Sequence, residues 1–149
     1  MKSTLFRFTL FALLFSGTAS FAQKLAVYST SGKAIHGYDP VAYFTDGKPV
    51  RGDSTVTYTH EGATWQFATP AHRDAFKADP QKYTPQYGGY CAFGTSRGYK
   101  APTEPDAWTI VDGKLYLNYN AKVRTDWNKD QSGYIQKADK NWPKIKDTN

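Results

Sequence analysis

The chain has very little sulfur. Its 149 residues include one cysteine, Cys91, and one methionine, Met1. A single cysteine excludes an intrachain disulfide, and an unpaired thiol needs an explanation if the protein works in an oxidising compartment.

Long hydrophobic runs and clusters of charge are absent too. The N-terminal apolar run, residues 8–15, is much shorter than the roughly 20 residues that span a bilayer. Lysine and arginine total 19 against 13 acidic residues, for a formal net charge of +6, and the basic residues form no block. The short run argues against a membrane span, although an uncleaved anchor or a buried first helix stays the alternative for this segment, and the scattered charge argues against a nucleic-acid partner.

The N-terminus has the order of features typical of a secretory leader. Lys2 and Arg7 precede or border the apolar run, and the small residues Ser20 and Ala22 occupy the positions that signal peptidase requires. These features predict a signal peptide over residues 1–22, cut after Ala22, and a periplasmic or secreted mature chain. Cleavage also removes Met1, so Cys91 is the sulfur that remains.

Residues 23–149 have the length of one domain, and such a domain can bury a core without cross-links. Residues 54–60 and 63–68 alternate in polarity around Glu61-Gly62, which predicts a hairpin. Residues 108–111 and 114–119 flank Asp112-Gly113, a pair that favours a type I′ turn. We therefore predict an α+β fold: a small antiparallel sheet built from hairpins, short helices packed on it and a C-terminal helical segment.

The remaining elements are predicted from local signals. An edge strand is expected over residues 25–29, and a helical turn over 41–44. A helix should begin at Thr69-Pro70 and stop near Asp79-Pro80, since a capping residue followed by proline is typical of a helix start. Residues 87–94 are too rich in glycine for a regular element. One or two helices are expected over residues 121–141, ended by Pro143.

Four side chains are candidates for soft metal ligands or nucleophiles. Cys91 is either a ligand or a small buried residue, because free cysteine is among the most buried types. His72 shares a helix face with Phe76, so it is either a core histidine or a ligand. His36 lies in a loop, where binding residues tend to collect. His60 is expected to be exposed and inert.

The residues also permit two further classes of function. A thiol enzyme needs a nucleophile, a base and an orienting acid, and Cys91 with a histidine and Asp39 or Asp106 would supply them, but no motif typical of a catalytic cysteine surrounds Cys91. Aromatic residues make up 16% of the chain. They can form a stacking platform for sugars or other flat ligands, or simply the core of a small domain.

Several short motifs, in their order and spacing, resemble the YHS domain over residues 36–83: Asp39-Pro40-Val41, Tyr58, Gly62, Trp65-Gln66-Phe67, Phe76, Asp79-Pro80 and Tyr83. Three more resemble a longer exported subfamily of YHS-domain proteins: residues 36–44, residues 88–92 and Asn141-Trp142-Pro143. The resemblance implies a short module of the kind associated with copper-transporting ATPases and multicomponent hydroxylases, and a role in binding metal.

The chain departs from the metal-binding members at the ligand positions. Ala42 and Ala68 stand where those relatives carry cysteine, and His72 replaces a third cysteine. The thiolate site of the family therefore cannot be carried over. A metal would need Cys91, His72 and His36, a donor set suited to Cu(I) or Zn(II).

Three hypotheses follow. The first is a periplasmic metal-handling accessory protein of copper type, whose site is completed by a metal-handling partner or a second subunit. The second is an interaction or small-ligand binding module in which no metal binds and Cys91 is structural. The third, and least favoured, is a thiol-dependent enzyme.

Overall fold

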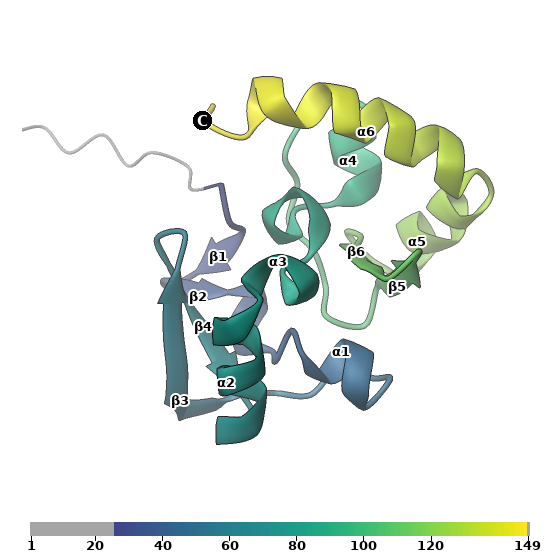
Figure 1. The fold of residues 1–149 in the computed structure, drawn as a ribbon. Coiled ribbons are helices and arrows are strands. Elements are labelled where there is room, and N and C mark those ends of the chain that lie inside the picture. The colour runs from purple at the N-terminus through teal and green to yellow at the C-terminus, as the bar shows by residue number, and fades with distance from the viewer. Residues whose placement is uncertain (1–25, 149) are drawn as a thin grey trace, which may run out of the picture.

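The computed structural model describes residues 26–148 (Figure 1). The predicted α+β class is confirmed: short helices accompany a four-stranded sheet and a two-stranded sheet. Within the described range, no helix is both long and apolar enough to cross a membrane. The predicted leader, residues 1–22, lies outside that range.

The larger sheet has the strand order β1-β2-β4-β3. Its strands are β1 (Ser29–Thr30), β2 (Lys33–Ala34), β3 (Asp53–His60) and β4 (Ala63–Phe67). The predicted hairpin forms β3 and β4, and its turn residues Glu61 and Gly62 both have positive φ. The sheet is mixed, because β2 pairs parallel to β4.

The first strand is shorter than predicted. The edge strand expected over residues 25–29 is reduced to Ser29–Thr30. Val27 instead packs into the core, fully buried. An apolar run of this kind is compatible with a strand or with a buried loop, and here the loop is held by a bond from the Tyr28 N–H to the Gly88 carbonyl, 2.9 Å long.

The short elements of this half are α1 (Ala42–Thr45), α2 (Pro70–Ala78), α3 (Pro80–Tyr83) and a 3-10 turn, η1 (Ile35–Gly37). Helix α2 packs on β3 and β4, and α3 contacts α2 and β6 (Lys114–Leu117). Helix α2 begins where predicted, because the Thr69 hydroxyl accepts the N–H of His72 at 3.1 Å. Asp79 ends α2 and caps α3 in the same way. Phe76 is the fully buried residue of α2.

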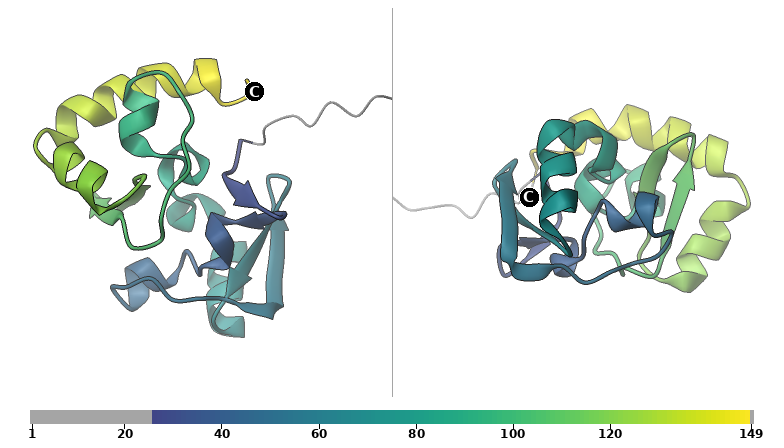
Figure 2. Two further views of the ribbon diagram at one scale, coloured as in Figure 1. Left: turned by 180° about the vertical axis from the view of Figure 1, so that it is seen from behind. Right: turned by 60° about the horizontal axis from the view of Figure 1, so that its bottom comes forward.

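The second half of the chain is mainly helical (Figure 2). It contains the 3-10 turn η2 (Gln86–Gly89), α4 (Ala92–Ser96), the hairpin of β5 (Trp108–Val111) and β6 (Lys114–Leu117), and the helices α5 (Ala121–Asn128) and α6 (Gln131–Ile145). The Asp112-Gly113 turn was predicted correctly, with both residues at positive φ. Residues 87–94, expected to be irregular, form η2 and the start of α4.

The expected stop at Pro143 is wrong. Helix α6 continues through Pro143 to Ile145, and the Lys146 N–H bonds to the Trp142 carbonyl at 2.9 Å. Proline removes one internal hydrogen bond of a helix. Packing of Tyr134, Ile135 and Trp142 against the core outweighs that loss.

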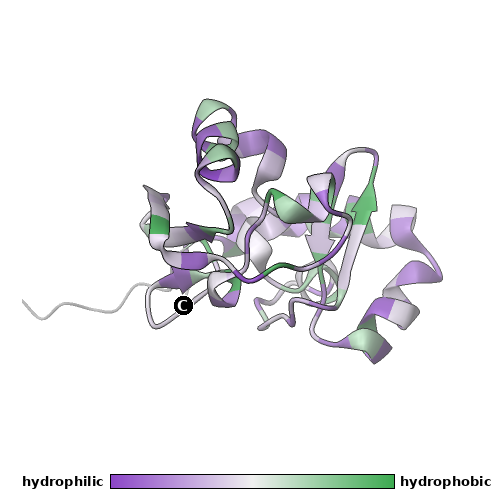
Figure 3. Cartoon of the chain, turned by 90° about the horizontal axis from the view of Figure 1, so that it is seen from below, coloured by the Kyte–Doolittle hydropathy of each residue, from purple (hydrophilic) through white to green (hydrophobic). Residues whose placement is uncertain are grey.

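Strand β6 separates two hydrophobic cores. Leu115 and Leu117 point into the core of the sheet half, which is centred on Trp65, Phe67 and Phe76. Tyr116, between them, points into the core of the helical half. Successive side chains of a strand face opposite sides, so one strand contributes to both cores. Figure 3 shows that individual helices carry both hydrophilic and hydrophobic residues, as expected when one face packs on a core.

Candidate functional site

His72 is held by a buried carboxylate. Asp39 is fully buried, and its Oδ2 accepts the His72 Nδ1–H at 2.6 Å. The other ring nitrogen, Nε2, lies 3.3 Å from the Thr45 hydroxyl. Because Nδ1 donates to Asp39, a neutral His72 carries its lone pair on Nε2. The His72 side chain is 17% exposed.

His36 is occupied on both ring nitrogens. Its Nε2 lies 2.9 Å from the Thr103 carbonyl oxygen and 3.3 Å from the Tyr28 hydroxyl. Its Nδ1 lies 3.3 Å from the Thr30 hydroxyl. His36 therefore connects the first strand to the loop before β5, which is a structural role.

Cys91 is buried at the start of α4. Its thiol donates to Asn118 Oδ1 at 3.5 Å, and its sulfur accepts the Gly94 N–H at 3.4 Å. Burial raises the pKa of the thiol, against smaller opposing effects of the Gly94, Tyr119 and Phe93 backbone N–H groups. At neutral pH the residue is a neutral thiol, because the ordinary cysteine pKa is already about 8.5.

The structure does not bring these three predicted ligands together. Each has its own partners: Asp39 and Thr45 for His72, Thr103, Tyr28 and Thr30 for His36, and Asn118 for Cys91. Among residues 26–148, no group of three or more His, Cys, Asp or Glu side chains is placed to hold a metal ion. The donors of the described residues do not fit a copper or zinc site formed by this chain alone.

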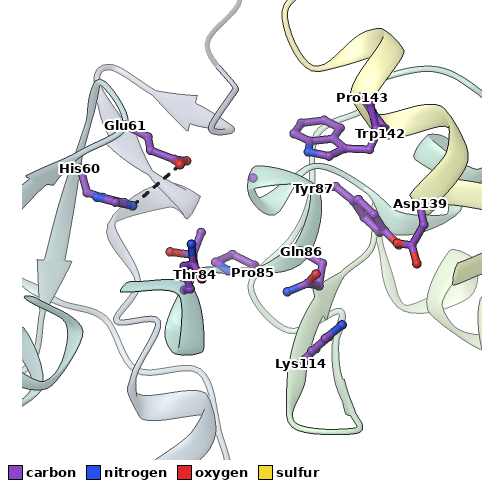
Figure 4. Close-up of a pocket in the computed structure, with 12 residues that line it drawn as sticks. His60, Glu61, Thr84, Pro85, Gln86, Tyr87, Lys114, Asp139, Trp142 and Pro143 are labelled. Carbon is purple, nitrogen blue, oxygen red and sulfur yellow. Dashed lines mark hydrogen bonds and ion pairs between the residues drawn. The ribbon is translucent and has the colours of Figure 1, made fainter. Parts of the chain in front are cut away.

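A cleft of about 670 Å³ lies between the two halves (Figure 4). His60 and Glu61, at the β3–β4 turn, face Tyr87 of η2 and Trp142 of α6 across it, and Asp139 of α6 lies on the far side of Tyr87. The segment that joins α3 to η2 lies between them, and Lys114 stands at the lower end. The lining thus combines an aromatic wall with amides, carboxylates and an amine: His60, Glu61, Gln81, Thr84, Pro85, Gln86, Tyr87, Gly88, Lys114, Asp139, Trp142 and Pro143.

His60 is partly buried, not exposed as its place beside a turn suggested. Its side chain is 27% exposed, and its ring meets Phe76 edge-on at 5.7 Å. It also lines the cleft. Contact with Phe76, which is distant in sequence, decides its orientation.

Tyr87 is strained at the cleft. It has φ 57° and ψ 34°, and Gly88 follows with φ 61°. An aromatic residue rarely adopts this left-handed conformation. The Tyr87 hydroxyl donates to Asp139 Oδ1 at 2.9 Å, and the ring lies 6.0 Å from those of Tyr116 and Trp142. Backbone strain of this kind concentrates at functional sites.

No family model, no curated protein and no solved structure matches this chain. The YHS resemblance therefore remains a prediction from motifs. The three positions where the metal-binding relatives carry cysteine do lie around Asp39. The Ala42 N–H bonds to Asp39 Oδ1 at 3.3 Å, and the Ala68 N–H bonds to Oδ2 at 2.8 Å, beside His72. The alanines add only methyl groups to this cluster.

The sequence predicted Cys91, His72 and His36 as candidate metal ligands. It did not predict the hydrogen bond between His72 and Asp39, or the cleft. Cleft residues come from β3, α3, η2, β6 and α6, so no single motif contains them. The Gly88-Gly89 pair is a local signal that could have indicated a close approach of the backbone there. Gly88 is required because a Cβ there would overlap the Ala26 carbonyl oxygen.

We expect the Cys91 thiol to make unfolding depend on pH. The unfolded thiol ionises first, near pH 8.5, so the stability gained from the neutral buried form is complete below that pH and is lost as pH rises toward the folded pKa. From about pH 7 to about pH 9.5, the wild type should lose up to about 1.4 kcal/mol more than Cys91→Ser. Urea unfolding at both pH values measures this, and equal losses would contradict it.

Proposed function

We propose that this chain is an exported binding protein for a small polyhydroxylated molecule, of the saccharide class, held in the cleft of Figure 4. The observation that supports this best is the composition of the lining, where Trp142 and Tyr87 stand with carboxylates and amides around about 670 Å³. That volume is within the range of small-ligand sites, which favour the boundary between two packed units. The predicted leader supports export.

The aromatic and polar groups of the cleft suit different faces of a sugar ring. Tryptophan offers a flat apolar surface for the C–H face of the ring. The side chains of Gln81, Gln86 and Lys114 can donate to hydroxyl oxygens, and Glu61 and Asp139 can accept from hydroxyls. The Tyr87 hydroxyl engages Asp139 Oδ1, and Oδ2 remains the second acceptor.

The charge of the lining favours a neutral or weakly basic ligand. Glu61 and Asp139 are acidic and Lys114 is basic, so the lining has no cationic excess. A strongly anionic ligand would need such an excess. Burial and the Asp139 carboxylate raise the pKa of Tyr87, which keeps this tyrosine a hydrogen-bond donor at neutral pH.

Binding of neutral disaccharides of glucose and of N-acetylglucosamine tests the proposal. We expect saturable amide shifts at the cleft in ¹H–¹⁵N spectra, and affinity lowered at least about tenfold by Trp142→Ala. Asp139→Asn should lower it by less. Tyr119→Ala, an exposed aromatic outside the cleft lining, is the matched control and should bind normally. No saturable binding, or equal binding by Trp142→Ala, would end the proposal.

A second candidate is metal handling of copper type, which the YHS resemblance implies. One observation favours it: Asp39 fixes the His72 Nδ1–H, which leaves the lone pair on Nε2, the nitrogen 3.3 Å from the Thr45 hydroxyl. Metal-ligating histidines almost always have such a carboxylate partner on the other nitrogen. One imidazole is not a complete site, so the other ligands would have to come from a metal-handling partner or a second subunit.

Metal titration separates the two candidates. If His72 is a metal half-site, Zn²⁺ or Cu(I) added under reducing conditions should shift the His72 ring resonances, and His72→Gln should abolish the shift. Cys91→Ser should leave it unchanged, because the thiol has other partners. Metal uptake that survives His72→Gln would exclude this half-site, and saccharide binding would be unaffected either way.

A further inference from the structure

A second, smaller cavity of about 290 Å³ opens beside Cys91. Its lining contains no acidic or basic side chain: Cys91, Phe93, Tyr99, Ala101, Tyr119 and Val123. None of these residues lines the saccharide cleft. The cavity is therefore a separate feature, and its apolar lining needs a different occupant.

Two exposed tyrosines border this cavity. Tyr99 is 50% exposed and Tyr119 is 49% exposed, and among the large hydrophobic residues of 26–148 these two are classed as exposed. They come from different segments, the loop after α4 and the segment between β6 and α5. Large aromatic residues left open to solvent at one place are typical of a binding surface.

Backbone contacts fix the two segments that carry Tyr99 and Tyr119. The loop that carries Tyr99 folds back on α4 through bonds from the Tyr99 N–H to the Gly94 carbonyl, 3.2 Å, and from the Cys91 N–H to the Ala101 carbonyl, 3.0 Å. The Tyr99 ring lies against Gly94, since a Cβ there would be 3.0 Å from the ring. On the other side, the Tyr119 backbone N–H lies near enough to the Cys91 sulfur to lower the pKa of the thiol, against the larger effect of burial.

We propose that this cavity binds a neutral, planar, apolar molecule of about two fused rings, between Tyr99 and Tyr119 and above Cys91. Size supports this, because a cavity of about 150 Å³ holds benzene and this one has nearly twice that volume. The absence of charge in the lining supports neutrality, since a buried charge without a partner is costly. The thiol contributes a soft, polarisable contact to the ring.

Indole is a suitable probe, being neutral, planar and bicyclic. We expect saturable one-to-one shifts of the Ala101 and Tyr119 amides in ¹H–¹⁵N spectra. Tyr119→Ala should weaken binding at least about fivefold, and Val123→Phe, which fills the cavity, at least about tenfold. Indole-3-acetate, which adds a carboxylate, should bind at least about tenfold more weakly than indole.

The control is Trp142→Ala, which removes the aromatic wall of the other cleft and should bind indole normally. Failure here and failure of the saccharide proposal are thus distinguishable. The proposal is overturned if the shifts do not saturate, if they fall outside the cavity, or if folded Val123→Phe binds indole as the wild type does. Dimerisation that accounts for the shifts, seen by sedimentation, would also overturn it.

Discussion

Replacing Asp39 by alanine should lower the free energy of unfolding by about 4 kcal/mol. The carboxylate is fully buried and accepts four N–H groups. Oδ1 takes those of Val41 at 2.8 Å and Ala42 at 3.3 Å, and Oδ2 takes those of Ala68 at 2.8 Å and His72 at 2.6 Å. Each donor left unsatisfied costs about 1–3 kcal/mol. Water that enters the space left by the carboxylate can bond to some of these donors, which reduces the total cost.

A loss of this size should lower the melting temperature by roughly 12–20 °C for a domain of this length. Thermal unfolding followed by circular dichroism measures it. Asp46→Ala is the matched control, because Asp46 is exposed and its Oδ1 accepts the Thr45 hydroxyl, at 2.9 Å. Its effect should stay below about 0.5 kcal/mol. Similar melting temperatures for the two variants would mean that Asp39 does not join the loop, sheet and helix.

Asp39→Asn separates the charge from the hydrogen bonds. The amide oxygen can still accept from Val41 and Ala42, and a neutral His72 can move its proton to Nε2 and accept at Nδ1. Only the Ala68 N–H would then lose its acceptor, because it would face the NH₂ group of the asparagine. We expect this variant to lose about half as much as Asp39→Ala, and the His72 ring resonances to report the changed tautomer.

Phe76→Ala should cost about 3–5 kcal/mol, the usual range for a buried phenylalanine. Phe76 is fully buried and is the residue of α2 that joins the sheet core. Its ring centre lies 5.2 Å from those of Trp65 and Phe67 and 5.7 Å from that of His60. No neighbour can fill the space without leaving its own contacts, so a cavity should remain.

Urea unfolding measures this loss, and Tyr99→Ala is the control because its ring is half exposed and should cost at most about 1 kcal/mol. Phe76→Leu keeps most of the volume and should cost less than half as much as alanine. Since Phe76 supports His60, we also expect the leucine variant to weaken saccharide binding slightly at the sheet side of the cleft. A cost below about 1 kcal/mol for Phe76→Ala would contradict a close-packed core at this position.

Local signals were sufficient for much of the fold. The hairpins at Glu61-Gly62 and Asp112-Gly113 were predicted because both turns need residues that tolerate positive φ, and both contain glycine. The start of α2 was predicted because Thr69 and Pro70 act within one turn of helix. Alternation along β6 indicated burial but not that its two faces serve different cores.

Contacts between distant segments account for the rest. The parallel pairing of Lys33 with Thr64 and the bond between Asp39 and His72 each join residues about thirty positions apart. The continuation of α6 past Pro143 depends on packing against Tyr87, which no helix-stop rule includes. Contacts of this kind also determine the surroundings of the predicted metal ligands. His72 bonds to Asp39, His36 to Thr103 and Cys91 to Asn118.

The amino-acid sequence was enough to predict an α+β fold, its two hairpins and the α2 helix start, because turns and caps act over a few residues. It was also enough to identify Cys91, His36 and His72 as the candidate ligands by residue type. The position of the cleft, the burial of the Cys91 thiol and the pairing of Asp39 with His72 came from the packing of remote segments, because cavities and desolvation exist only where several elements meet.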